Sequence, residues 1–426
     1  MLSITDHLKK GGPTYAYRVE FTPVTPRIEL GVPKVAQYSQ ERQAFPVPRG
    51  NRFATMVSAN RVDFGGDLIL ETQGLPAKVT AATENMAANM TQVPVVFEAA
   101  ADAPISGTLG SFSAKPLDPK NVFPSSFSQM AEYIINQPGQ SIYWSGTVNK
   151  AAFAVTQEVP FKINIVEPKV PLVHNGSMQM KVVVERAAGF KAAITILPLY
   201  NPPGVGSATS VVIPEGQNEV FLPINANGGA PVRKWKYAVA GTAVVGTGPV
   251  WVSSQLATLE IAAPYLGLTF ERGAVEQGKE TQIFVKIANA KPFAGTAKVK
   301  LVGLPAKTST IDLDITKDTK EIAFPIKTEP ASPPGIHRNL FCQVTVIENG
   351  EPIVHTIGAT ELRIDVPLPP KKDQPPVVVV AQPKKDPTPM PTAVPPKRLS
   401  RLEQLRLEQE EREKAAKQGG TVLPKK

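Results

Sequence analysis

The sequence is poor in the residues from which disulfides and metal sites are built. It holds one cysteine, Cys342, and four histidines among 426 residues. A single cysteine excludes an intramolecular disulfide and a zinc site with cysteine ligands. The histidines match no metal-site spacing, and no nucleophile elbow or phosphate-binding glycine loop is present. We therefore expect no enzyme activity and no cofactor, and we expect Cys342 to be a buried apolar residue.

Long apolar runs are also missing. None approaches the roughly 20 residues of a membrane span, and the first twelve residues lack the apolar centre of a signal peptide. The net charge is +9, but residues 371–426 alone hold 13 Lys/Arg against 7 Asp/Glu. Because the rest is close to neutral, we expect no nucleic-acid-binding face. We also expect no transmembrane segment, and the N-terminus is compatible with a gene model truncated at its start.

What the sequence does contain is a half-module repeated three times. Each copy has a glycine, an alternating apolar segment, a phenylalanine, a second alternating segment and a proline: Gly50, Phe64 and Pro76; Gly176, Phe190 and Pro202; Gly278, Phe293 and Pro305. The glycine-to-phenylalanine spacing is 14, 14 and 15 residues, and the phenylalanine-to-proline spacing is always 12. Alternation between Gly/Pro turns predicts antiparallel strands. We predict an all-β fold of three tandem immunoglobulin-like β-sandwiches, with each phenylalanine in a core.

Each module is expected to close with an apolar strand that stops at a proline. Such strands occupy residues 161–165, 259–261 and 362–366. The predicted modules therefore span residues 24–168, 169–264 and 265–367. A similar strand precedes Pro23, and we assign residues 1–23 to the terminal strands of a truncated domain. The alternative is that this strand joins the edge of the first module.

The first module carries an insertion at residues 111–144, with a short helix expected at 127–135. A long excursion of this kind is either a recognition loop or a flexible connection. After the third module, the proline content predicts a disordered linker at 368–398. A capping box, Ser400 to Glu403, then opens a charged helix at 399–418, followed by a disordered tail at 419–426.

Three groups of residues are candidate binding sites. Trp235, Tyr237 and Trp251 could stack on a carbohydrate, with Tyr143 and Trp144 near predicted strand edges; the alternative is that they are core residues. Asp312, Asp314 and Asp318 could bind calcium, or form a solvated strand face. The narrow apolar stripe of the C-terminal helix, which could dock on a partner or remain in solvent, consists of Leu399, Leu402 and Leu405.

Several segments carry a resemblance to a known group of proteins. They are KGGPTYAYRV (10–19), PFKI (160–163), EPKVPL (167–172), LRIDVPLPP (362–370) and LSRLEQLR (399–406). The chain resembles the C-terminal portion of large exported bacterial proteins in which a pre-peptidase C-terminal (PPC) domain precedes immunoglobulin-like modules. The resemblance implies an extracellular or cell-envelope location and structural or accessory work.

Three functions are compatible with these observations. The first is a non-catalytic structural or interaction protein, a stalk or display module, whose partner is a protein or an envelope polysaccharide. The second is an accessory region of a secreted peptidase or other hydrolase. The third is a carbohydrate-binding module.

Overall fold

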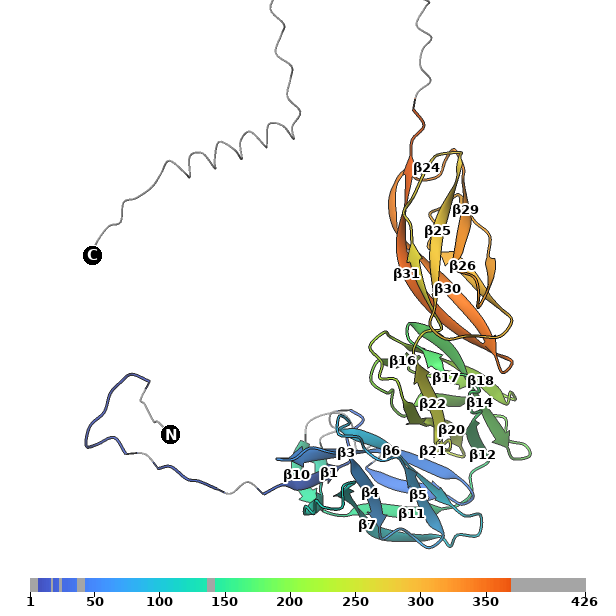
Figure 1. Cartoon of the computed structure of the whole chain (residues 1–426). Coiled ribbons are helices and arrows are strands. Elements are labelled where there is room, and N and C mark those ends of the chain that lie inside the picture. Colours follow the sequence, from blue (N-terminus) through green and yellow to red (C-terminus); the bar gives the residue numbers. More distant parts are fainter. Residues whose placement is uncertain (1–6, 17, 23–24, 37–42, 136–141, 369–426) are drawn as a thin grey trace, which may run out of the picture. The chain divides into compact units, whose positions relative to one another are not determined.

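A computed structural model describes residues 7–16, 18–22, 25–36, 43–135 and 142–368 (Figure 1). These residues form strands and loops without a helix, which confirms the all-β prediction. None of the described segments is a helix long and apolar enough to span a membrane. The predicted linker beyond Leu368, the C-terminal helix and the tail lie outside the described residues.

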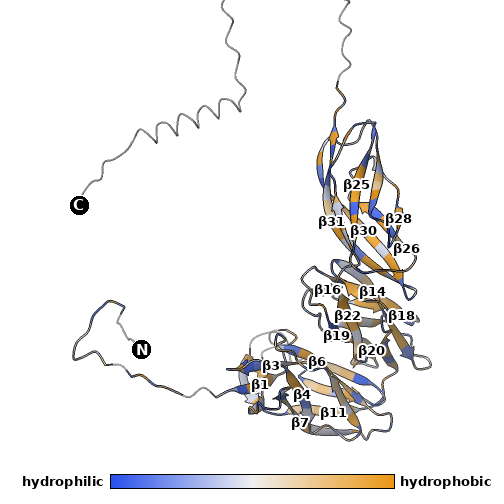
Figure 2. Ribbon diagram, viewed as in Figure 1, coloured by the Kyte–Doolittle hydropathy of each residue, from blue (hydrophilic) through white to orange (hydrophobic). Residues whose placement is uncertain are grey.

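The first sandwich (blue in Figure 1) encloses a cluster of four phenylalanines. One sheet has the order β5 (Val79–Thr83), β6 (Gln92–Ala99), β3 (Arg52–Val62), β1 (Arg27–Gly31), β8 (Ser125–Phe127). The other has the order β2 (Ala44–Pro48), β11 (Ala151–Thr156), β7 (Ser106–Pro116), β4 (Leu68–Gln73). Between the sheets lie Phe45, Phe97, Phe112 and Phe153, with ring centroids 5.0–6.3 Å apart. Side chains of both sheets thus build one core, and Figure 2 shows hydrophobic and hydrophilic residues mixed along the strands.

The second sandwich is green in Figure 1. One sheet contains β12 (Phe161–Ile165), β14 (Gly176–Arg186), β18 (Glu219–Ala226) and β16 (Val205–Ser207). The facing strands form two short sheets: β13 (Leu172–Val173), β22 (Ala257–Ala262) and β19 (Lys234–Tyr237); and β17 (Val211–Ile213), β15 (Ile194–Pro198), β20 (Val239–Val245) and β21 (Gly248–Ser253).

The third sandwich, yellow to orange in Figure 1, repeats this arrangement. One sheet is β23 (Leu266–Phe270), β25 (Glu280–Asn289), β29 (Glu321–Thr328), β27 (Thr308–Ser309). The other contains β24 (Gly273–Glu276), β31 (Glu351–Asp365), β30 (Gly335–Glu348), β26 (Thr296–Val302) and β28 (Leu313–Thr316). In all three sandwiches the opening segment contains two strands. The first pairs antiparallel with the next long strand of one sheet, and the second, after the chain crosses to the other sheet, pairs parallel with the last strand of the sandwich. The described modules are therefore immunoglobulin-like.

The strand at 161–165 belongs to the second sandwich, which corrects the predicted boundary at 168. β12 pairs antiparallel with β14, and Ile163 lies opposite Val184. Pro168 follows β12 where the chain crosses between the two sheets of the second sandwich. A proline after an apolar strand marks an interruption of pairing, and this interruption occurs after an opening strand as well as after a closing one.

The three sandwiches are joined by direct hydrogen bonds within one compact unit, residues 1–367. Between the first and second, the Asn51 side-chain amide donates to the Phe161 carbonyl over 2.8 Å. Between the second and third, β14 pairs with β31 so that Gly176 lies opposite His355, which makes one nine-stranded sheet. The joints are therefore fixed by pairing and packing, not by proline stiffness alone.

The repeated phenylalanines are only partly core residues. Phe293 is buried, whereas Phe64 and Phe190 are half-buried. Phe64 lies 4.6 Å from the ring of Phe123, and Phe190 stacks 5.5 Å from Phe161. These two rings therefore close the rim of a core instead of filling it.

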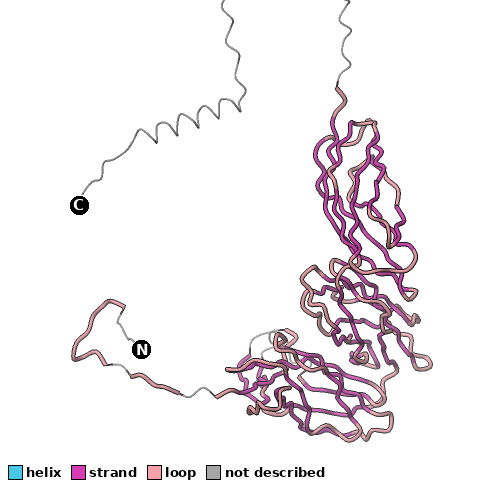
Figure 3. The backbone as a smooth tube through the Cα atoms, in the orientation of Figure 1, coloured by secondary structure: helices cyan, strands magenta, loops and turns pink. Residues whose placement is uncertain are grey.

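The N-terminal segment forms no strand in its described residues, 7–16 and 18–22. Figure 3 draws these residues as loop. Tyr15, Val19 and Phe21 are exposed. The edge beside β1 is taken by β8, so the segment does not extend the first module either. The alternative of an added edge strand is therefore wrong, whereas the assignment of residues 1–23 to a truncated domain stays a prediction, because an alternating pattern forms a stable strand only where a partner edge is available.

Candidate functional site

The insertion in the first module ends in a two-stranded hairpin instead of the expected helix. β9 (Gln129–Ile135) and β10 (Ile142–Val148) pair antiparallel in a sheet of their own. β8, just before them, pairs in parallel with β1. The prediction of a helix at 127–135 is therefore wrong, because these residues pair as strands. The insertion lies between the end of β7 and the start of β11. We call the two strands, residues 129–135 and 142–148, the aromatic hairpin.

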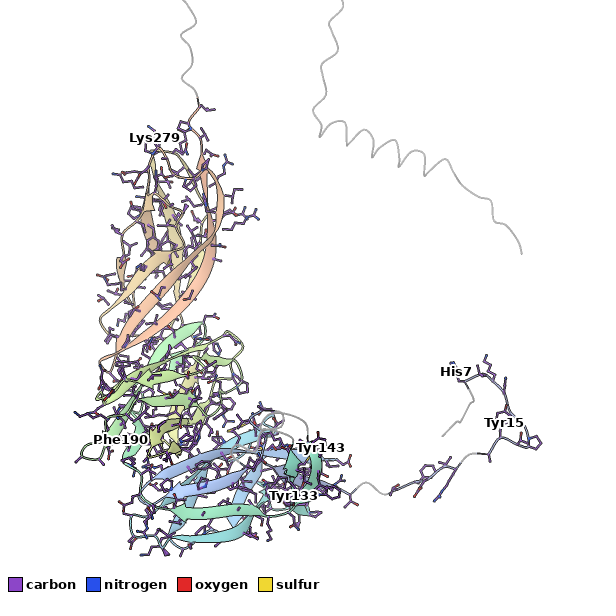
Figure 4. All side chains as sticks on the ribbon, turned by 180° about the vertical axis from the view of Figure 1, so that it is seen from behind. His7, Tyr15, Tyr133, Tyr143, Phe190 and Lys279 are labelled. Carbon is purple, nitrogen blue, oxygen red and sulfur yellow. The ribbon has the colours of Figure 1, made fainter. Side chains whose placement is uncertain are left out.

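The aromatic hairpin exposes five large apolar side chains. The exposed fractions are 53% for Met130, 60% for Tyr133, 55% for Ile134, 68% for Tyr143 and 62% for Trp144. Figure 4 shows Tyr133 and Tyr143 projecting from this hairpin. In the described part of the chain, none of the three aromatic rings makes a hydrogen bond or contacts another ring. Ile134 lies opposite Trp144 on the two strands, so these two exposed side chains are cross-strand neighbours.

The ring of Tyr133 lies across the hairpin backbone at Gly146. A Cβ atom added to Gly146 would stand 3.1 Å from Tyr133 Cε2. Gly146 pairs with Ala131, two residues before Tyr133, so the ring covers a diagonal neighbour that has no side chain. The glycine leaves room for this edge of the ring, and Tyr133 as a whole is 60% exposed.

The base of the hairpin is anchored to the sandwich by polar contacts. Glu132 is buried and forms an ion pair with Lys34. The Gln129 side-chain amide donates to the Gln43 carbonyl over 3.2 Å, and the Ser128 N–H donates to the Leu30 carbonyl over 2.9 Å. Breaking a buried ion pair is costly, so this base holds the hairpin in one place on the module.

A small cavity opens beside Tyr133 at this base. Its volume is about 230 Å³, and its lining includes Gln43, Gln129 and Met130. Two buried side-chain amide atoms, Gln43 Nε2 and Gln129 Oε1, have no hydrogen-bond partner in the described part of the chain. One is a donor and the other an acceptor. Unsatisfied buried polar atoms are rare in native proteins and call for an explanation.

The hairpin and its module are electrically neutral. Between Lys120 and Lys150 the sequence has a single charged residue, Glu132, which Lys34 neutralises. Residues 25–156 contain ten Lys/Arg and ten Asp/Glu. Nothing in this composition favours a highly charged ligand.

The predicted carbohydrate platform at Trp235, Tyr237 and Trp251 is not formed. Trp235 and Tyr237 are fully buried, and the Trp235 indole N–H donates to the Pro231 carbonyl. Trp251 is half-buried against the core. The strand face that carries Trp235 and Tyr237 turns inward, so neither ring can stack on a ligand. The other predicted site residues, Leu399, Leu402 and Leu405, lie outside the described residues.

The three aspartates of the calcium hypothesis lie on an exposed surface. Asp314 forms an ion pair with Lys298 across the strands, at 3.3 Å. The described residues contain no group of three or more potential metal ligands. Asp314 lies in β28, with Asp312 just before this strand and Asp318 in the turn after it, and all three residues are exposed.

A larger cavity, of about 470 Å³, lies beside β14, between the part of this strand that pairs with β12 and the part that pairs with β31. Its lining is mainly apolar, including Met178 and Phe221, with two charged groups. Both charged groups are already engaged. Lys181 pairs with Glu219 at 2.7 Å, and the Glu351 carboxylate accepts from the Lys169 N–H over 2.9 Å. No unsatisfied polar group points to a ligand here.

Three buried titratable groups with displaced pKa values, Glu84, His355 and Cys342, lie away from the hairpin. Burial raises the pKa of Glu84, which faces Arg233 between the first two sandwiches. Burial lowers the pKa of His355 to about 4 and raises that of the Cys342 thiol to about 12. Cys342 is buried, as predicted. Because these groups are buried, their titration is expected to affect the stability of the fold.

Comparison with known proteins adds no family. No family model matches the chain, and no curated protein matches it. Solved structures match only loosely. A protein of unknown function from Porphyromonas gingivalis W83 (10% identity, TM-score 0.19) aligns over 48% of this chain and 100% of its own. The fibronectin(III)-like modules of Clostridium thermocellum CbhA (9%, TM-score 0.19) align over 48% and 94%. Escherichia coli alpha-2-macroglobulin (10%, TM-score 0.19) aligns over 84% of this chain and 23% of its own. These alignments are too loose to support an argument, and the fold assignment rests on the strand pairing.

Proposed function

We propose that this chain is a non-catalytic interaction protein of the bacterial envelope or extracellular space, in which joined sandwiches display the aromatic hairpin to a partner. The observation that carries the proposal is the set of five exposed apolar side chains on one hairpin. Interfaces draw most of their binding energy from a few residues, among which Trp and Tyr are enriched. The hairpin supplies Tyr133, Tyr143 and Trp144.

The scaffold beneath the hairpin supports this role. The Lys34–Glu132 ion pair and the Gln129–Gln43 hydrogen bond fix the hairpin base. A binding element that is held in place before it meets its ligand loses less conformational entropy on binding. Stiff joints between modules then set the distance between the hairpin and the rest of the chain.

The location rests on the resemblance to exported PPC-containing proteins. The same resemblance supports the alternative, an accessory region of a secreted peptidase or other hydrolase. That alternative predicts a neighbouring reading frame that encodes an enzyme domain. Sequencing the DNA upstream of the first codon distinguishes the two.

Binding to isolated cell envelopes tests the proposed role. The purified full chain is cosedimented with envelope fractions, beside the triple variant Tyr133→Ser, Tyr143→Ser, Trp144→Ser. We expect the triple variant to bind at least about 100-fold more weakly, because each lost aromatic hot spot costs on the order of 1–2 kcal/mol.

A second variant controls for general surface stickiness. Leu109→Ser with Val244→Ser removes two equally exposed apolar side chains elsewhere, and it should bind as the unmodified chain does. Equal binding by the triple variant, at unchanged thermal stability, would rule out the hairpin as the recognition element.

A further inference from the structure

We propose that the free edge of β10 pairs with the same edge of a second copy of this chain. Two hairpins then join into one four-stranded antiparallel sheet across a two-fold axis. This inference goes beyond the proposed function, because self-pairing requires no envelope ligand. It rests on residues 144–148 of β10.

The main chain of β10 is paired on one side only. In the described residues its one strand partner is β9, and the two strands form a sheet of their own. Alternate residues of such a strand direct their N–H and C=O groups to the open side. Trp144, Ser145 and Thr147 are exposed along this stretch, so another strand can reach it. Open main-chain groups of this kind are a template for a further strand.

The strand β10 lacks the features with which proteins block their sheet edges. Charged side chains, proline and short length are the usual ones. β10 has seven residues, none of them charged and none a proline, and its irregular pairing ends at Ser145. Both six-residue edge strands are blocked, because β4 contains Glu71 and β21 contains Pro249. Apart from β9, which contains the buried Glu132, the remaining edge strands of the described sheets have five residues or fewer.

The absence of charge favours a second copy as the partner. An edge strand that meets its own copy repeats every residue on the other side, so a lysine or a glutamate would bring like charges together. In the antiparallel register centred on Gly146, Ser145 lies opposite Thr147 of the second copy. Trp144 then lies opposite Val148. Hydroxyl pairs, and pairs of an aromatic with a β-branched residue, both stabilise antiparallel sheets.

Pairing through the edge leaves the faces of both hairpins open. Side chains of a strand point to the two faces of its sheet, away from the edge that carries the hydrogen bonds. The dimer therefore presents the exposed apolar side chains of the hairpin twice. Two linked binding elements hold a surface more tightly than one, through avidity.

Sedimentation equilibrium of the purified full chain tests self-pairing. A contact as small as one strand edge is weak, so the chain is measured from about 1 to 300 µM. We expect a reversible equilibrium between monomer and dimer. A chain that stays monomeric over this range overturns the inference and leaves the proposed function standing.

Two lysine variants locate the contact. Thr147 and Met130 are cross-strand partners, and both are exposed. Thr147→Lys adds a charge at the free edge, whereas Met130→Lys adds the same charge one strand further in. We expect Thr147→Lys to weaken dimerisation at least tenfold and Met130→Lys to change it less than threefold, with thermal unfolding as the check on folding. Dimerisation that resists Thr147→Lys, or that both variants weaken equally, overturns the inference.

Hydrogen exchange of the unmodified chain tests the same contact without a substitution. Between dilute and concentrated solutions, we expect amide protection to rise at alternate positions of residues 144–148, because only the N–H groups on the open side gain a partner. A dimer whose protection rises only outside β10 has its contact elsewhere, and that result overturns the inference.

Discussion

The Arg233–Glu84 contact between the first two sandwiches gives a sharp test of how firmly they are joined. Arg233 Nη2 lies 2.7 Å from Glu84 Oε2, and the Glu84 side chain is only 9% exposed. The Lys236 N–H donates to the other carboxylate oxygen over 3.3 Å. Replacing Arg233 with Ala leaves a buried carboxylate with that single backbone donor, and we predict that this variant is measurably less stable.

The size of the effect follows from the burial of the two partners. Removing one member of a fully buried ion pair costs roughly 3–5 kcal/mol. The Arg233 side chain is 30% exposed and the Lys236 N–H remains, so we expect a loss of about 2 kcal/mol at neutral pH. Burial already raises the pKa of Glu84 above 4.5 in the folded chain, and the substitution raises it further. The folded state then binds the proton more tightly than the unfolded state, so the loss shrinks as pH falls through that raised pKa.

Urea denaturation of the full chain at pH 7.5 and pH 5 measures this effect. Arg233→Ala should lose about 2 kcal/mol at pH 7.5 and less at pH 5. Glu84→Gln with Arg233→Ala should recover most of the loss, because no charge remains buried. If Arg233→Ala is as stable as the unmodified chain at pH 7.5, Glu84 is solvated and the joint is open.

Three further predictions concern the third sandwich. In Gly303→Ala (φ +88°), the new Cβ would lie 1.9 Å from the Asn339 carbonyl oxygen, so the free energy of unfolding should fall by at least about 3 kcal/mol. The control Gly189→Ala (φ +81°) places its Cβ in open space and should lose about 1 kcal/mol. Equal losses in the two variants would contradict the close approach at Gly303. Because burial holds the pKa of His355 near 4, the unfolded chain binds a proton more readily, and the free energy of unfolding should fall by up to about 3 kcal/mol from pH 6.5 to 4. The variant His355→Met should show a weaker dependence on pH. If the dependence is unchanged in this variant, other groups cause it. Burial raises the pKa of the Cys342 thiol to about 12, so a thiol reagent should modify it only in denaturant; rapid modification of the folded chain would show that this core opens.

The repeat was visible in the sequence because its signals are local. Gly50 and Gly278 adopt φ values of +63° and +75°, and Asn175 takes +54° just before Gly176. Such conformations favour glycine and asparagine, so the turns leave a trace in the residue types. Alternation then fixed the strands, and together they were sufficient to predict immunoglobulin-like sandwiches.

The choice of strand partner was not local, and there the prediction failed. The sequence of β12 predicted a closing strand, but β12 opens the second sandwich. The prediction failed because an alternating pattern does not identify the strand with which a segment pairs. Trp235 and Tyr237 share a strand face, but only the opposing sheet decides that this face is the core. Exposed aromatics on a strand and buried ones have the same sequence pattern.

The aromatic hairpin had a signal that pointed to it. Apolar residues at 133–135 and 142–144 flank the turn-rich segment NQPGQS (136–141), which is typical of two strands joined by a loop. The helical interpretation of 127–135 considered only the first half of this pattern. The cavity at Gln43 and Gln129 had no such signal, because it joins residues 86 positions apart.

The central claim is that the aromatic hairpin carries recognition, and one comparison of single variants tests it most directly. Trp144 and Leu109 are similarly exposed, at 62% and 68%, and both belong to the first module. Affinity for envelope fractions is measured for Trp144→Ala and Leu109→Ala in the full chain, with thermal unfolding as the check on folding. The account predicts at least a tenfold loss for Trp144→Ala and no change for Leu109→Ala. Equal affinities of the two folded variants would contradict it.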